Sequence, residues 1–218
     1  MRVYHFVNEQ FGIEDIQCRR MKIARIDALN DPFEWLAVEA SNAQVRRAFQ
    51  TVKVQLAIST GILCFSKDWR NPVQWGHYAD RHRGICMGFD IPDTQLKAVS
   101  YVISRFPFDW PRMQGDAEFA EEFMQQVISS KFSHWRYEQE LRSFVRLDPA
   151  TEQNGLYYMD FSSDLRLSEV IIGASSSITR SQLADALGDL AGNVHCRKAR
   201  LAFRSFRVVE QRKANLWP

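Results

Sequence analysis

The sequence predicts one α+β domain. Short apolar runs that suit buried strands alternate with stretches in which apolar residues recur at helical spacing, and this mixture is typical of an α+β fold. The chain has 218 residues, of which 45% are hydrophobic, so it is long enough to bury a core within a single domain. Its 15 Phe and 6 Trp argue for a packed globular protein and against disorder. No internal repeat or linker divides it.

The first part of the chain is predicted to alternate strands and helices. A helix is expected over residues 9–20, because Phe11, Ile13 and Ile16 share one side of it. A second helix is expected over residues 35–58, which are rich in Ala and Gln. The other elements expected here are strands over residues 2–7, 22–28, 62–65 and 85–89, a turn over 30–34, and a helix that begins after Pro72.

The second part of the chain has one strong helical pattern. It covers residues 116–135, where Phe119, Phe123 and Val127 form an apolar stripe opposite a row of glutamates. Residues 93–104 fit no single element, although 99–103 are strand-like. The other elements expected here are strands over residues 140–147, 156–161, 169–173 and 196–210, a helix over 177–187, and an aromatic and proline-rich loop over 105–115.

Composition and cysteine spacing narrow the class of protein. The net charge is only +2, so no electrostatic preference of the whole molecule for a partner follows. The 4 cysteines are scattered without a C-x-x-C pair, which argues for a reducing, cytoplasmic location and against a structural zinc site. The chain shows no signal-peptide pattern. No apolar run approaches the roughly 20 residues that a membrane span needs.

The segment from Gly61 to Phe89 is the most informative part of the chain. Two apolar strands bracket a short polar and aromatic helix, where an ordinary loop would carry Ser, Gly and Lys. Rings and titratable groups gathered between core strands indicate a ligand pocket. The alternative, of about equal weight, is that the rings cover one end of a sheet. The residues concerned are Trp69, Trp75, His77, Tyr78, Asp80 and His82.

The histidines give two candidate sites. Alternation along the first strand places His5 on the face opposite Tyr4, although a single histidine in a strand is more often structural. The pattern His77-x-x-Asp80-x-His82 has the residue types of a metal site. Histidines five residues apart do not share a helix face, and no third ligand follows at a recognisable interval. We therefore expect no metal, and a pocket-lining His77 is the favoured interpretation.

The turn Asn30–Glu34 is a weaker candidate. Asp31 can cap a helix that begins at Pro32, and this capping role explains the composition of the turn. Presentation of Asn30 or Glu34 to a pocket is the less favoured alternative.

A pair of glutamates opens the strand predicted over residues 140–147. Alternation places Glu138 and Glu140 on one face of that strand, together with Arg142. Two carboxylates on one face are costly unless they are solvated or paired, and Arg142 can keep one of them ionised. The two interpretations, a functional pair and a surface ladder of ion pairs worth little for stability, have similar weight.

The C-terminal segment from Arg197 to Arg207 interleaves cations with Phe203 and Phe206. On a strand, such a pattern can meet the phosphates and bases of a nucleic acid. A solvated face of the sheet is the commoner explanation.

These motifs, taken in order, resemble a known family. Tyr-His-Phe, Asn-Asp-Pro-Phe-Glu, Trp-x-His-Tyr-Ala and Tyr-Glu-x-Glu-x-Arg resemble a widespread bacterial family described as a domain of unknown function, over roughly residues 3 to 175. That family is similar in turn to ADP-ribosyltransferases, including the DNA-modifying toxins of toxin–antitoxin and phage-defence systems. The resemblance implies an α+β fold with a split mixed and antiparallel β-sheet core and flanking helices.

The resemblance also implies roles for particular residues. Glu140 would stabilise the oxocarbenium-like transition state of NAD cleavage, Glu138 would orient or activate the acceptor, and Tyr78 would stack on nicotinamide. His5 would hold the adenosine ribose or the diphosphate. The wider cofactor-binding set is Tyr4, Asn30, Ser66, Trp75, His77 and Arg142. Ser66 fits one subclass of the superfamily, and His5 with Tyr78 fits another, so the subclass stays open, as does the choice between Glu138 and Glu140 as the catalytic carboxylate.

The predicted function is NAD-dependent ADP-ribosylation of a macromolecule by a toxin or anti-phage defence effector. NAD is the expected substrate, nucleic acid is slightly favoured over protein as the acceptor, and an antitoxin protein is an expected partner. One alternative is a nucleic-acid-binding protein or metal-assisted nuclease built on His77, Asp80 and His82. The other is a catalytically inactive module that senses NAD or another nucleotide.

Overall fold

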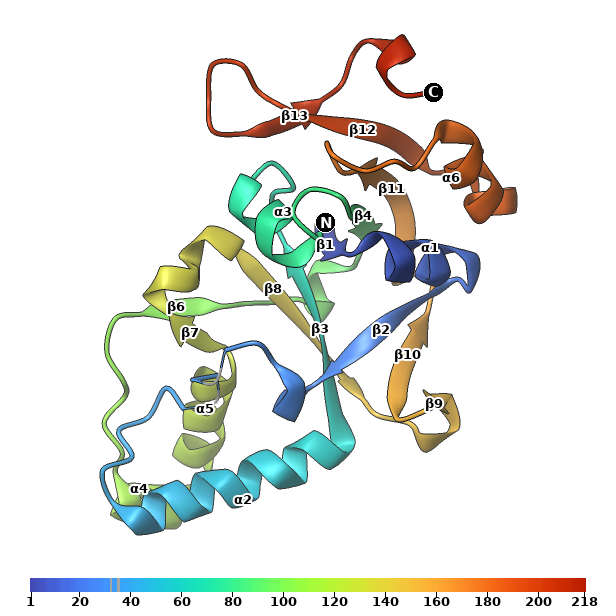
Figure 1. The fold of residues 1–218 in the computed structure, drawn as a ribbon. Helices are drawn as coiled ribbons and strands as arrows, with labels where there is room; N and C mark the ends of the chain where they lie inside the picture. Colours follow the sequence, from blue (N-terminus) through green and yellow to red (C-terminus); the bar gives the residue numbers. More distant parts are fainter. Residues whose placement is uncertain (32, 35) are drawn as a thin grey trace.

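A computed structural model describes residues 1–31, 33–34 and 36–218, and shows a mixed α+β fold around one large sheet (Figure 1). The predicted fold class, α+β with a mixed sheet, is confirmed. The strands are β1 Arg2–Val7, β2 Arg20–Arg25, β3 Thr60–Ser66, β4 Ile85–Asp90, β5 Lys97–Ala98, β6 Ser100–Val102, β7 Ser130–Phe132, β8 Glu140–Arg146, β9 Glu152–Gln153, β10 Leu156–Asp160, β11 Arg166–Ile172, β12 His195–Leu201 and β13 Val208–Glu210. The α-helices are α1 Glu9–Gln17, α2 Ala43–Ser59, α3 Pro72–Tyr78, α4 Trp110–Gly115, α5 Ala117–Ile128 and α6 Arg180–Leu187.

The main sheet is mostly antiparallel. Its strands follow the order β13-β12-β11-β4-β1-β3-β2-β10-β9, and β8, with β5 beyond it, joins through β3. Within the described chain, β11 and β12 form the parallel pair of this sheet, and β6 and β7 form a separate parallel pair. The sheet is therefore mixed, and its central strands are β4, β1 and β3.

Strand β3 is where the sheet opens. One edge of β3 pairs with β8 along its whole length, from Thr60 to Ser66. The other edge is shared, because β2 pairs with it only at Gly61 and Ile62 and β1 only at Ser66. In the described part of the chain, residues 63–65 thus have no strand partner on that edge. We call this gap between β1 and β2 the fork.

The core lies on both faces of the central strands. On one face, Met87 of β4 packs in a cluster with residues of α1 and α6 such as Ile16 and Leu183. On the other face, Cys86 packs with Phe6 and other residues in a second cluster. Both faces of β4 are covered, which explains why its sequence is a continuous apolar run without alternation. No helix in the described ranges is both long and apolar enough to cross a membrane.

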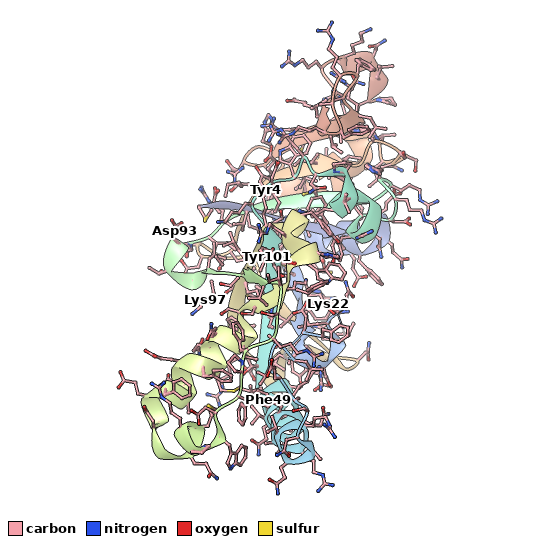
Figure 2. The ribbon with its side chains drawn as sticks, turned by 90° about the vertical axis from the view of Figure 1, so that its left-hand side faces the viewer. Tyr4, Lys22, Phe49, Asp93, Lys97 and Tyr101 are labelled. Carbon is pink, nitrogen blue, oxygen red and sulfur yellow. The ribbon has the colours of Figure 1, made fainter. Side chains whose placement is uncertain are left out.

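A smaller apolar cluster joins α2 and α5 at the far end of β3. Phe49 of α2 packs near Phe123 and Val127 of α5, and Figure 1 shows these two helices with α4 at one end of the molecule, away from α1 and α6. Figure 2 shows the same separation from the side, with Phe49 in the lower part and Tyr4 in the upper part. The fork lies between these two parts.

The helix predicted over residues 35–58 begins later than expected. It starts at Ala43, because the side chain of Asn42 accepts a hydrogen bond from the backbone of Gln44 and caps the helix there. Before this cap the chain is extended where Val38 bridges to Phe106.

The turn region before this helix also differs from expectation. The predicted helix start at Pro32, and Trp35, lie outside the described residues. The strand predicted over residues 22–28 instead spans Arg20–Arg25 as β2, and residues 26–28 form a 3₁₀ turn.

The helix predicted over residues 116–135 is wrong in its last third. It ends at Ile128, where the hydroxyl groups of Ser129 and Ser130 donate to carbonyl oxygens of the last turn and compete with its continuation. The chain then forms β7 and a 3₁₀ helix, η3, over Ser133–Glu138.

Two further predictions need correction. The loop predicted over residues 105–115 contains α4, which Asp109 caps. The strand predicted over 196–210 is a hairpin, β12 and β13, because the chain turns back between Ala202 and Arg207 with a backbone hydrogen bond of 2.9 Å.

Candidate functional site

A cavity of about 120 Å³ lies at the fork. β1 and β3 supply part of its wall, α3 and the residues after β2 supply another part, and β7, η3 and the start of β8 complete it. Its lining residues are Tyr4, His5, Phe6, Leu29, Asn30, Glu34, Cys64, Phe65, Ser66, Gln74, Tyr78, Lys131, Glu138 and Glu140. The fork thus brings together side chains from five distant parts of the chain.

Most of the residues predicted to be catalytic or to bind NAD line this cavity, but three do not. Trp75 is fully buried behind the wall and donates from Nε1 to the carbonyl of Trp69 at 2.6 Å. His77 lies outside, where its Nδ1 is 2.9 Å from the hydroxyl of Tyr137. Arg142 lies behind the carboxylates and is 1% exposed. Direct contact with a ligand in the cavity is therefore not expected of these side chains.

Five charged side chains form a buried network along the cavity. Lys131 Nζ lies 2.7 Å from Glu138 Oε2, 3.0 Å from Glu34 Oε1 and 3.3 Å from Glu140 Oε2. Arg142 donates from Nε to Glu140 Oε1 at 2.8 Å and from Nη2 to Glu34 Oε2 at 2.5 Å. All five are buried, so the alternative of a solvated ladder at the surface is wrong.

The network holds more carboxylates than cations. Three glutamates face one lysine and one arginine. Burial of an ion costs several kcal/mol unless partners compensate it, so an excess of one carboxylate disfavours the fully ionised form of the network. Such an imbalance is more typical of a functional site than of a structural ion pair.

The two glutamates have pKa values that move in opposite directions. Burial raises the pKa of Glu138, and Lys131 and Tyr78 only partly oppose it. Burial acts on Glu140 in the same way, but the charge and hydrogen bonds of Arg142 outweigh it and lower its pKa. A pair of carboxyls whose environments push their pKa values apart can divide acid–base and electrostatic roles between them.

The two carboxyl groups share a face for a different reason from the predicted one. Glu138 is the last residue of η3 and not part of a strand. Gln139 has a left-handed backbone with φ of 47°, and Glu140 opens β8, where its backbone N–H donates to the hydroxyl of Tyr101 at 2.8 Å. The tight turn, and not strand alternation, brings both carboxyl groups within ion-pair distance of Lys131.

Tyr78 is held against Glu138 by a short hydrogen bond. Its hydroxyl donates to Glu138 Oε1 at 2.5 Å. Burial, and then the carboxylate of Glu138, raise the pKa of Tyr78, so the phenol keeps its proton and remains a donor. Its ring forms part of the cavity wall.

Helix α3 is fixed to the rest of the site by Gln74. Asn71 caps the helix and Pro72 occupies its first turn. From this helix, Gln74 Nε2 lies 3.0 Å from both Ser66 Oγ on β3 and the carbonyl oxygen of Glu138. The amide therefore joins three walls of the cavity.

His5 lines the cavity as a neutral ring. Burial lowers its pKa, and the hydrogen bond to Cys64 only partly opposes this. Its Nδ1 lies 3.0 Å from the carbonyl oxygen of Cys64, and a carbonyl can only accept, so Nδ1 carries the proton and Nε2 is an acceptor. His5 therefore offers a hydrogen-bonding atom but no positive charge to a ligand.

Cys64 is not activated as a nucleophile. Burial, and then the charge of Glu140, raise the pKa of its thiol well above the ordinary value. The thiol stays protonated, whereas a reactive cysteine needs the thiolate.

Three residues of the site had little or no signal in the sequence. Lys131 was hidden inside the helix predicted over 116–135, although a lysine between Ser130 and Phe132 interrupts its apolar stripe. Glu34 was the less favoured interpretation of its turn, yet it is 3% exposed and bonded to both cations. Gln74 carries no motif, and only its burial in the fold reveals it.

His77, Asp80 and His82 each have separate partners. Asp80 forms an ion pair with Arg83 at 2.8 Å, and the ring of His82 stacks on Trp75 at 6.2 Å between centroids. Throughout the described ranges, no three His, Cys, Asp or Glu side chains are grouped as metal ligands would be.

The turn after Tyr78 has an unusual backbone. Asp80, Arg81 and His82 have φ of 43°, 54° and 68°, a left-handed region that costs non-glycine residues about 1–2 kcal/mol each. The turn is held because His82 and Gly84 donate backbone hydrogen bonds to Trp75 and Ala79, and Ser175 donates one to His82. This strain lies directly beside the cavity wall.

Comparisons of the chain with protein-family models, with curated proteins and with solved structures give no match. The residues of the cavity and their geometry are therefore the basis for inferring function.

Proposed function

We propose that the chain is an NAD-dependent ADP-ribosyltransferase whose cavity at the fork holds the nicotinamide end of NAD. The observation that carries this proposal is the pair Glu138 and Glu140, which lie on one cavity wall with pKa values shifted in opposite directions. The fork also supports it, because the resemblance of the sequence implies a split sheet.

The cavity is large enough for only one end of NAD. Pockets that enclose a drug-sized ligand measure roughly 300–1,000 Å³, and this cavity measures about 120 Å³. A wider hollow of about 840 Å³ lies next to it, with Tyr78 as a wall of both. In this proposal the nicotinamide ring and its ribose enter the cavity, and the rest of NAD follows the hollow past Tyr78.

The proposed reaction breaks the bond between the ribose C1′ and the nicotinamide nitrogen. Nicotinamide leaves with the bonding electron pair, and the positive charge that builds on the ribose is stabilised by ionised Glu140. The acceptor's nucleophile then bonds to C1′ and its proton passes to Glu138, whose raised pKa makes it a better proton acceptor than an ordinary glutamate. Lys131 and Arg142 hold the two carboxyls in place.

The acceptor in this proposal is a macromolecule that binds outside the cavity. A cavity of about 120 Å³ that holds nicotinamide and its ribose has no room for the body of an acceptor. A role as a toxin or defence effector, with a neutralising antitoxin, follows from the resemblance and forms part of the same proposal.

The test is transfer of label from NAD. Purified protein is incubated with labelled NAD and lysate, and the lysate is then divided into protein, DNA and RNA fractions. We expect label in one fraction, and a loss of about 100-fold or more in Glu140→Gln, since a preorganised group at the developing charge is worth that much. Glu121→Gln, an exposed glutamate of α5, is the matched control and should transfer label normally.

Tyr78→Phe is a second test of the site, because unfolding alone would also abolish transfer in Glu140→Gln. It keeps the ring on the wall but removes the hydroxyl that Glu138 accepts, so it should fold and transfer more slowly. Full activity in both variants would sink the site assignment. NAD binding without any nicotinamide release would favour the sensing module, and cleavage of nucleic acid without NAD would favour the nuclease.

A further inference from the structure

The turn between β12 and β13 carries two aromatic rings in solvent. Phe203 is 91% exposed and Phe206 is 98% exposed, the highest values among the large hydrophobic side chains of the described residues. Figure 1 shows the loop between these two strands projecting from the upper end of the molecule, beyond α3. We call residues 202–207 the hairpin tip.

Folding does not account for these rings. A side chain that stays in water gains nothing from the hydrophobic effect, and neither ring belongs to an apolar cluster of the core. Large aromatic groups gathered at one exposed place mark an interaction surface. The hairpin tip is therefore a candidate for binding a partner.

Cations alternate with the rings. The guanidinium of Arg200 lies 4.7 Å from the centroid of the Phe203 ring, Arg204 is exposed between the two phenylalanines, and Arg207 follows them. The tip thus presents two rings with the cation of Arg204 between them, and the cation of Arg200 beside Phe203.

We infer that the hairpin tip binds single-stranded nucleic acid and presents it to the cavity as the acceptor, a role that rests on the proposed function. A single strand alternates phosphates with stackable bases, and exposed rings between cations complement both. A membrane surface fits less well, because Arg204 between the two rings keeps a charge at the point where an apolar wedge would enter the bilayer.

The base of the hairpin is tied to the cavity wall. Arg207 Nη2 lies 2.8 Å from Asp68 Oδ2, and the backbone of Val208 donates to the carbonyl of Arg70 at 2.9 Å. The backbone of Asp68 in turn donates to Ser66 Oγ at 3.2 Å, and Ser66 lines the cavity. The hairpin that would hold the nucleic acid is therefore attached to the turn after β3, directly beside the cavity wall.

Fluorescence anisotropy with labelled oligo(dT) and oligo(U), without NAD, tests the inference on the full chain. We expect binding that weakens by about tenfold or more for Phe203→Ala and for Phe206→Ala, since one stacked base is worth at least that factor. Arg204→Ala should lower the slope of log Kd against log salt by about 1. Phe11→Ala, which removes an exposed phenylalanine of α1, is the control and should bind as the unaltered chain does.

The outcomes separate this inference from the proposed function. Nicotinamide release is measured with lysate as the source of acceptor, and oligonucleotide binding without NAD. Release without any oligonucleotide binding overturns the inference alone, and binding without release overturns the transferase alone. If both phenylalanine variants bind as tightly as the unaltered chain, or if the chain binds phosphatidylserine vesicles in place of oligonucleotides, the inference is also overturned.

Discussion

Two clusters of ion pairs in this molecule differ in how well their charges are balanced. At Asp90, one carboxylate accepts from Arg2 at 2.6 Å, from Arg166 at 2.8 Å and from the hydroxyl of Ser168 at 2.7 Å. Arg2 holds the pKa of Asp90 down to about 2 against a smaller effect of burial. At the cavity, three glutamates share two cations, and the pKa of Glu138 rises.

The difference shows what to look for in a functional site. The carboxylate charge of Asp90 is fully compensated, and its partner Arg166 is largely exposed. These ion pairs link the neighbouring strands β1, β4 and β11. The cavity network has one more carboxyl group than cations in a place that water barely reaches. A surplus of carboxyl groups at a cavity, and not the number of ion pairs, distinguishes the two.

Removing a cation from each cluster gives the largest expected contrast. Lys131→Met leaves three buried glutamates on one arginine, so we expect a loss of about 3–5 kcal/mol in the free energy of unfolding. Arg166→Ala removes an exposed partner, and the expected loss is below about 1 kcal/mol. Urea denaturation measures both.

A second substitution checks the cause of the Lys131→Met effect. Adding Glu138→Gln removes the carboxyl that lies nearest to Lys131, and should recover part of the lost stability. If the double variant is less stable than Lys131→Met by the full cost of Glu138→Gln, the charge imbalance is not the reason.

Asp15 provides an intermediate test, because it is buried without an ion pair among the described residues. Burial raises its pKa to about 7, against a smaller effect of Arg20. The folded protein therefore favours the protonated form, and its stability falls as pH rises from the ordinary aspartate range towards 7. Asp15→Asn should be more stable than the original by about 2 kcal/mol at pH 8 and equal to it at pH 4.

Thermal unfolding across that pH range decides the matter. The difference between Asp15→Asn and the unaltered chain must grow with pH. A constant difference, or one that shrinks as pH rises, would show that Asp15 is ionised in the folded protein, as Asp90 is.

The strained turn beside the cavity gives the smallest effect. Arg81 is exposed and has φ of 54°, so Arg81→Gly relieves strain but adds entropy to the unfolded chain. The net gain expected is roughly 0.5–1 kcal/mol, measured by urea denaturation with exposed Arg47→Gly in α2 as a control that should lose about 1 kcal/mol. A loss at Arg81 would mean that its side chain contributes more than the backbone strain removes.

The sequence could predict the elements whose pattern is local. β3, β4 and α3 lie close to their expected places, because apolar runs and the Asn71-Pro72 cap are local signals. Glu138, Glu140 and Arg142 were expected together because they are close in sequence, although the Gln139 turn that joins them was not foreseen.

The rest depends on contacts that local patterns do not encode. Lys131 belongs to the site only because α5 stops at Ile128 and β7 turns towards η3. Glu34 meets Arg142 across 108 positions of sequence, and no spacing rule links them. Phe203 and Phe206 looked like residues of a strand, because the fold of the hairpin depends on pairing with β13.

The fork has a mechanical consequence. β1 and β2 touch β3 through one and two register pairs respectively, whereas β8 holds β3 along its whole length. The sheet therefore has two arms that share a single strand, β3. Both arms supply lining residues to the cavity, Tyr4 and His5 from β1 and Leu29 and Asn30 from the segment after β2, so the width of the cavity depends on how the two arms are set on β3.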